Sequence, residues 1–148
     1  MSRKKDGPFM PSLNVDPAKC CGCRICEMAC SMVHLGVFNP KKALLRVEIN
    51  RLPSLATDTS KIDVPVVCLQ CDPAPCSEAC LEGAVRKADV GFWMIDPARC
   101  TGCGSCADAC PHGMITVDSE QGIARKCDWC QGSPECVRYC PMEALTFS

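Results

Sequence analysis

The chain has 148 residues, enough for one domain or two very small ones. Its formal net charge of -1 gives no indication of a nucleic-acid or anionic-membrane partner, and 5% aromatic residues cannot form a large aromatic core. Cysteine is the exception: there are 17, a density that indicates disulfides or metal sites rather than ordinary packing.

The N-terminal segment, residues 1–12, is expected to be a flexible tail. It carries the charged run Arg3 to Lys5 but lacks the apolar stretch of an export signal. The chain has no apolar run of about 18 residues, so we expect no insertion into a membrane. Because disulfides need an oxidising compartment, these features predict a cytoplasmic protein with metal-binding rather than disulfide-bonded cysteines.

The first cysteine-rich stretch is CCGCRICEMAC, residues 20–30. Its spacing C-x2-C-x2-C-x3-C comprises Cys20, Cys23, Cys26 and Cys30. Three cysteines this close surround one face of an object larger than a single ion, and the fourth points elsewhere, which is typical of bacterial ferredoxins. Zinc ribbons instead separate two C-x-x-C pairs by a dozen or more residues. Cys21 does not fit the spacing, and we interpret it as a small buried thiol without a ligand role.

The segment between the first and second cysteine sets is long. Ala43–Ile49 predicts a strand, and RLPSLATDTSKIDVP, residues 51–65, predicts a surface loop. We expect an insert over residues 32–65 that covers a cluster or contacts a partner.

Three further sets of four cysteines follow. They are Cys68, Cys71, Cys76 and Cys80; Cys100, Cys103, Cys106 and Cys110; and Cys127, Cys130, Cys136 and Cys140. Each predicts a ligand loop followed by a helical turn, such as Cys106–Cys110, which the next proline stops. Short strands are expected at Val90–Ile95, Met114–Val117 and Ala144–Phe147.

The sequence repeats itself, because residues 15–30 align with residues 95–110. The second and fourth sets share a wider central spacing, so the order compact then expanded occurs twice, as duplication of a two-cluster ferredoxin would leave it. The four sets use 16 cysteines and predict four 4Fe-4S clusters. Lys19, Arg99 and Lys126 each precede a first ligand. These cations either raise the potential of a cluster or are simply exposed.

Particular phrases carry a family resemblance: CSMVHLGVFNPKKA, CLQCDPAPC and ARKCDWCQGSPECVRYCPMEAL. The sequence resembles the four-cluster polyferredoxin-type subunits of molybdenum and tungsten oxidoreductases, a family that includes the dimethyl sulfoxide reductase electron-transfer subunit. It looks most like the small soluble subunits of tungsten aldehyde oxidoreductase-type enzymes. The resemblance implies an α+β, duplicated bacterial ferredoxin-like fold over residues 13–148. An outer half would comprise residues 13–31 and 119–148, and an inner half residues 66–118.

The resemblance also implies which sets share a cluster, namely the first with the fourth and the second with the third. The four ligand sets would then be Cys20, Cys23, Cys26 and Cys140; Cys127, Cys130, Cys136 and Cys30; Cys68, Cys71, Cys76 and Cys110; and Cys100, Cys103, Cys106 and Cys80. Spacing alone predicts sharing but not this pairing.

The resemblance implies a non-catalytic subunit that relays electrons between a large tungsten- or molybdenum-pterin subunit and an external partner, such as a flavin subunit or a soluble ferredoxin. Nothing else in the sequence predicts a catalytic site: it has two histidines, His34 and His112, and no nucleotide-binding motif. Alternatives are a free polyferredoxin, or the iron–sulfur subunit of a carbon monoxide dehydrogenase, hydrogenase or formate dehydrogenase. A structural zinc-binding interaction module is the alternative of a different class.

Overall fold

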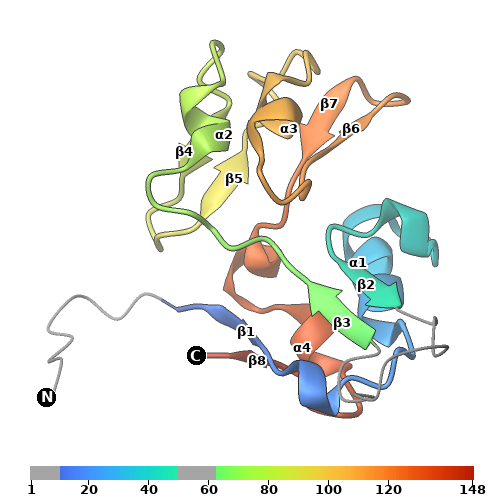
Figure 1. The fold of residues 1–148 in the computed structure, drawn as a ribbon. Coiled ribbons are helices and arrows are strands. Elements are labelled where there is room, and N and C mark those ends of the chain that lie inside the picture. Colours follow the sequence, from blue (N-terminus) through green and yellow to red (C-terminus); the bar gives the residue numbers. More distant parts are fainter. Residues whose placement is uncertain (1–10, 50–62) are drawn as a thin grey trace, which may run out of the picture.

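The computed structural model describes residues 11–49 and 63–148, which form a small mixed helix and strand fold (Figure 1). The helices are α1 (Ile25–Leu35), α2 (Pro75–Glu78), α3 (Ser105–Ala109) and α4 (Glu135–Arg138), with 3-10 turns η1 (Pro17–Lys19), η2 (Pro40–Lys42) and η3 (Trp129–Gly132). The strands are β1 (Leu13–Val15), β2 (Arg46–Ile49), β3 (Asp63–Val66), β4 (Val85–Lys87), β5 (Trp93–Ile95), β6 (Thr116–Asp118), β7 (Ile123–Arg125) and β8 (Leu145–Phe147).

The described strands pair as four separate two-stranded antiparallel sheets. Three sheets join strands that are neighbours in the chain: β2 with β3, β4 with β5, and β6 with β7. The fourth joins β1 to β8, with Leu13 opposite Phe147. Ser12 and Ser148 extend this ladder, since each N–H donates to the other's carbonyl, at 2.7 and 3.1 Å. Ser12, placed in the tail by the sequence prediction, is therefore held by hydrogen bonds; residues 1–10 lie outside the described part.

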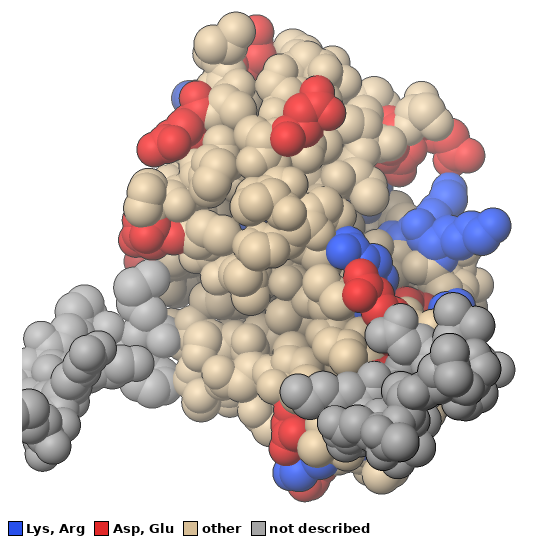
Figure 2. All heavy atoms as spheres, viewed as in Figure 1, with Lys and Arg blue, Asp and Glu red and all other residues tan. Residues whose placement is uncertain are grey.

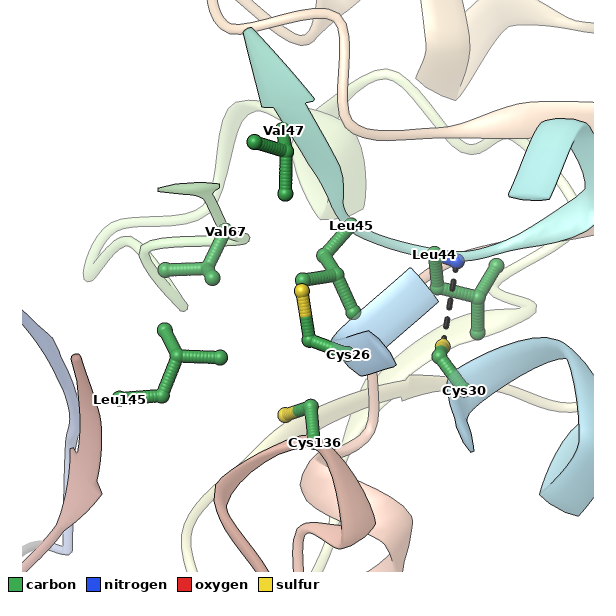
Figure 3. Close-up of a cluster of buried hydrophobic side chains, with 8 residues drawn as sticks. All are labelled: Cys26, Cys30, Leu44, Leu45, Val47, Val67, Cys136 and Leu145. Carbon is green, nitrogen blue, oxygen red and sulfur yellow. Dashed lines mark hydrogen bonds between the residues drawn. The ribbon is translucent and has the colours of Figure 1, made fainter. Parts of the chain in front are cut away.

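Two small hydrophobic cores hold the elements together. The first contains Leu44, Leu45, Val47, Val67 and Leu145 with the cysteines Cys26, Cys30 and Cys136 (Figure 3). The second contains Ala74, Val85, Ile115 and Ala124 with Cys76 and Cys106. Figure 1 shows the same division, with α1, α4, β1, β2, β3 and β8 in the lower group and the remaining helices and strands in the upper group. Sulfur atoms thus occupy the interior of both cores.

Helix α1 is longer than the single turn expected after the first cysteine set. It begins after Arg24, whose φ is 60°, and ends at Gly36, whose φ is 67° and whose N–H donates to the Met32 carbonyl at 2.9 Å. Such a left-handed residue is the usual end of a helix. Helix α3 is the single turn that the sequence predicted, and it ends two residues before Pro111.

Three expected strands are confirmed with shorter bounds, as β2, β5 and β8, and the fourth is confirmed as β6, which begins two residues later and ends one residue later than predicted. The expected loop over residues 51–65 is wrong at its end. Asp63 to Pro65 belong to β3, where Pro65 lies opposite Val47. Proline is tolerated there because both strands of a two-stranded sheet are edges. The rest of that predicted loop, residues 51–62, lies outside the described part.

The surface has a broad uncharged area on one face, with acidic and basic side chains nearer its margins (Figure 2). Across residues 11–49 and 63–148, none of the helices combines the length and the apolar character needed to cross a bilayer.

Candidate iron–sulfur cluster sites

Three small cavities are each lined by four of the expected ligands. The first is lined by Cys20, Cys23, Cys26 and Cys140, the second by Cys68, Cys71, Cys76 and Cys110, and the third by Cys80, Cys100, Cys103 and Cys106. In each cavity, three cysteines come from one set and the fourth comes from another. The third cysteine of the contributing set lies on a helix, α1, α2 or α3, and the cysteine from the other set is followed directly by a turn.

The remaining four expected ligands lie around the lower core. Cys30 and Cys136 are buried in it, with Cys127 packed against them. Burial raises the pKa of the Cys30 thiol to about 11, and the charge of Cys130 acts in the same direction. Burial also raises the pKa of Cys136 to about 12, with further contributions from Cys130 and Cys30. Cys30 of α1, Cys130 of η3 and Cys136 of α4 therefore lie near one another.

Backbone N–H groups point at the sulfur of the fourth cysteine of every set. Cys80, Cys110 and Cys140 each accept from the residue four positions later, at 3.3 to 3.4 Å. Cys30 accepts instead from Leu44, at 3.2 Å, because α1 continues past it (Figure 3). Donors of this kind stabilise thiolates and cluster sulfurs.

The thiols fit a metal cluster better than they fit an empty protein interior. Burial raises the pKa of Cys26 to about 12 and also raises that of Cys127. Only Cys103, which is exposed, has its thiol pKa lowered, through a hydrogen bond with Ser105. A buried thiolate needs a compensating cation, and soft thiolate ligands suit iron–sulfur clusters. Bound 4Fe-4S groups would supply one-electron transfer at these positions.

Lys126 differs from the other two cations that precede a first ligand. Lys19 and Arg99 are exposed, whereas Lys126 is only 6% exposed. Its ammonium donates to the carbonyl oxygens of Trp93 and Cys127, at 3.0 and 3.3 Å, and to Gln70 Oε1 at 3.3 Å. Lys126 also lines the second cavity beside the cysteines. The sequence did not distinguish this lysine, because its burial depends on residues far away in the chain.

His34 is a further residue that sequence reasoning did not assign to the site. Its Nε2 lies 3.6 Å from Cys130 Sγ and 3.6 Å from Asp128 Oδ1, which are nearly 100 residues away in the chain. His112 is exposed. No local sequence signal separates these two histidines, since each follows a fourth cysteine.

Cys21 is exposed, so its interpretation as a buried thiol is wrong. It lies at the edge of the first cavity, beside Cys20 and Cys23. Gly22 adopts a φ of 70° immediately after it, which turns the loop so that Cys20 and Cys23 face the cavity. The Cys21 thiol, between them, is exposed to solvent.

Residues 60–148 match the family model of the 4Fe-4S dicluster domain, which covers more than half of the chain. The chain belongs to this family. The match supports 4Fe-4S clusters and disfavours the zinc module.

Two curated relatives are similar over most of their length. The polyferredoxin-like subunit of the aliphatic sulfonate oxidoreductase of Pyrococcus furiosus is 35% identical, over 85% of this chain and 69% of its own. The thiosulfate reductase electron transfer subunit PhsB of Salmonella typhi is 33% identical, over 89% of this chain and 72% of its own. The predicted resemblance to iron–sulfur electron-transfer subunits is confirmed.

Among solved structures, the active-site complex BamBC of benzoyl coenzyme A reductase contains a similar chain. It is 26% identical, with a TM-score of 0.51, over 93% of this chain and 77% of the other.

Proposed function

We propose that the chain binds four 4Fe-4S clusters and relays electrons between a tungsten- or molybdenum-pterin catalytic subunit and an external donor or acceptor, such as a flavin subunit or a soluble ferredoxin. The observation that carries the proposal is the grouping of the cysteines. Three cavities each combine three cysteines of one set with one of another, which is the arrangement expected for shared ligands.

The proposed ligand sets follow from this grouping. One cluster takes Cys20, Cys23, Cys26 and Cys140; a second takes Cys127, Cys130, Cys136 and Cys30; a third takes Cys68, Cys71, Cys76 and Cys110; and a fourth takes Cys100, Cys103, Cys106 and Cys80. The electrostatic coupling of Cys30 with Cys130 and Cys136 supports the second set.

We further propose a duplicated ferredoxin-like architecture with an outer and an inner half. The two hydrophobic cores support it, since one contains cysteines of the first and fourth sets and the other those of the second and third. The inner half would extend to about residue 125 rather than 118, because β7 pairs with β6 and Ala124 lies in the inner core. Strand β2 lies within the expected insert over residues 32–65, and it contributes Val47 to the first hydrophobic core, which belongs to the proposed outer half.

The chain's own residues would set the properties of the relay. Thiolates hold the clusters, and backbone N–H groups such as that of Leu44 offset the negative charge on the sulfurs. Buried aliphatic side chains such as Leu145, which lines the first cavity, limit the access of water to the cluster proposed there. No residue is required to exchange protons or to bind a substrate.

An exposed apolar groove supports a protein partner. It has a volume of about 420 Å³ and is lined by Ile25, Met28, Met32 and Val33 of α1 with Phe38 and Tyr139. Phe38 is 66% exposed, and apolar patches of this kind commonly mark protein interfaces. The same helix carries Cys26 and Cys30, so a partner in this groove would lie close to the two proposed clusters that these cysteines bind.

The test is to purify the native chain anaerobically by a tag and to analyse its metal content and its partners. We expect about sixteen irons per chain and co-purification of a much larger pterin-containing subunit. About half that iron, with zinc in the remaining sites, would refute the cluster count. Recovery of the chain alone, iron-loaded and stable at micromolar concentration, would favour a free polyferredoxin.

The ligand sharing has a separate spectroscopic test. Cys30→Ser and Cys130→Ser should perturb the same paramagnetic signal, because both sulfurs belong to one proposed cluster. Cys23→Ser, from the same sequence set as Cys30, should perturb a different one. The opposite grouping would mean that each sequence set holds its own cluster.

A further inference from the structure

Lys126 lies where the outer and inner halves meet. The loop between Cys68 and Cys71 contacts the start of the fourth set, since Gln70 Nε2 donates to the Cys127 carbonyl at 2.6 Å. Gln70 Oε1 accepts from both the Trp93 N–H, at 2.7 Å, and the Lys126 ammonium. The lysine therefore lines the cavity of one proposed cluster and directly precedes a ligand of another.

The hydrogen bonds of Lys126 match an ammonium group. An ammonium has three N–H donors, and three oxygens accept from Nζ: Trp93 O, Cys127 O and Gln70 Oε1. Among the ion pairs of residues 11–49 and 63–148, none joins Lys126 to a carboxylate. A buried charge is costly unless it is compensated, and the cysteines that line the second cavity lie beside this lysine.

We propose that Lys126 is a positioning residue for the relay whose positive charge raises the reduction potentials of the two central clusters, held by the sets that begin at Cys68 and at Cys127. The inference deepens the proposed function and rests on its ligand sets. A cluster with four thiolates passes from a charge of about -2 to about -3 when it takes up one electron. A buried cation stabilises the more negative form, and solvent screens it little.

The charge of Lys126 reaches the cysteines of the second set. The lysine lines the same cavity as Cys68, Cys71 and Cys76. Its ammonium also donates to the carbonyl oxygen of Cys127, the first ligand of the fourth set, at 3.3 Å. The two central clusters would therefore share one cation, whereas Lys19 and Arg99, the equivalent cations of two other sets, are exposed to solvent.

The test is a potentiometric titration of the iron-loaded chain, followed by paramagnetic resonance under anaerobic conditions. Lys126→Gln removes the charge and keeps an N–H donor, and it should lower the potentials of two clusters and leave the other two unchanged. Arg99→Gln is the matched control, because Arg99 occupies the same place before an equivalent set, and it should shift none comparably. Unchanged potentials in Lys126→Gln, or equal shifts of all four clusters, would overturn the proposal.

A second variant covers the case in which Lys126→Gln loses iron. Gln70→Glu leaves the lysine in place and sets a carboxylate against its ammonium, so the same two potentials should fall. If they stay unchanged, the proposal fails. The wild-type iron content and number of signals are measured first: fewer than four clusters would contradict the proposed function, whereas four clusters without these shifts would contradict only the role of Lys126.

Discussion

At the residue scale, Gly102 adopts a positive φ of 70° in the loop between Cys100 and Cys103. A Cβ atom there would collide with the carbonyl oxygen of Gly122 in the turn between β6 and β7. Gly36 has a similar φ of 67°, but a Cβ atom there would have no neighbour within 4 Å. Substitutions at these two glycines therefore distinguish the cost of backbone strain alone from the cost of strain together with a steric collision.

We expect Gly102→Ala to destabilise the chain more than Gly36→Ala does. Both substitutions place a side chain in the left-handed region, at a cost of about 1 to 2 kcal/mol, and only the first also displaces Gly122. The measurement is the midpoint temperature at which the iron-loaded chain loses its visible absorbance, at one fixed heating rate. Equal midpoints for the two variants would show that the loop can move away from the added methyl group.

Cys20 and Cys21 are adjacent thiols with different environments. Cys20 packs against the lower core, whereas Cys21 is exposed. We expect Cys20→Ser to damage one cluster and Cys21→Ser to leave the iron content unchanged. Iron analysis of both variants, purified side by side without oxygen, checks this. Loss of iron in Cys21→Ser would mean that the first ligand of this set is Cys21.

At the element scale, Glu27 connects helix α1 to strand β2. Its side chain is buried, and Glu27 Oε1 accepts from the Val47 N–H at 2.7 Å. Glu27→Leu would leave this buried N–H without a partner, which costs about 1 to 3 kcal/mol. We therefore expect faster amide exchange in β2 and β3 and a lower midpoint temperature for cluster loss.

Glu27→Gln is the matched control for this prediction. It keeps an oxygen that can accept from the Val47 N–H. The backbone amides of β2 and β3 should therefore exchange more slowly in Glu27→Gln than in Glu27→Leu. If both variants match the wild type, α1 and β2 are held together by their apolar contacts alone.

The elements show where sequence reasoning succeeds and where it stops. Local signals sufficed for α3, because the helical turn is closed by Pro111, and for β5, which is apolar and short. The end of α1 also has a local signal, the glycine Gly36. Strand β3 had none, because Pro65 argues against a strand and only pairing with β2 explains it.

The candidate sites divide in the same way. The spacing of the cysteines predicts the four sets, because three neighbouring ligands are local. The proposed pairing of the sets depends on contacts between α1 and α4 and between α2 and α3, which spacing does not reveal, so only the family resemblance predicted it. Neither the spacing nor the resemblance predicts the burial of Lys126, since it depends on Gln70, in the loop of the second set, and on Trp93 of β5.

At the scale of the whole molecule, both cores contain cysteines that we propose as ligands. Removing iron anaerobically with a chelator should therefore unfold both halves, which far-ultraviolet circular dichroism would detect.

The raised thiol pKa values give a pH dependence for the stability of any fold that remains without iron. The pKa of the Cys30 thiol is 9.0 in an unfolded chain and about 11 in the folded chain. The stability that this buried neutral thiol contributes to the fold is therefore complete below pH 9 and declines as the pH rises towards 11.

A reductant without chelator is the control, because it leaves the iron in place and should leave the spectrum unchanged. A chelated chain that kept its full spectrum would show that the aliphatic residues alone stabilise the fold.

The pairing of β1 with β8 has a consequence for biosynthesis. Leu13 emerges early from the ribosome, but its partner Phe147 is made more than 130 residues later. The inner core, in contrast, uses only residues between Ala74 and Ala124 with their close neighbours. Chains fold progressively from the N-terminus as they are made. We therefore expect the middle of this chain to mature before its two ends, so that a chain that ends near residue 130 and has been released from the ribosome would already protect its inner thiols from alkylation while Cys20, Cys23 and Cys26 still react.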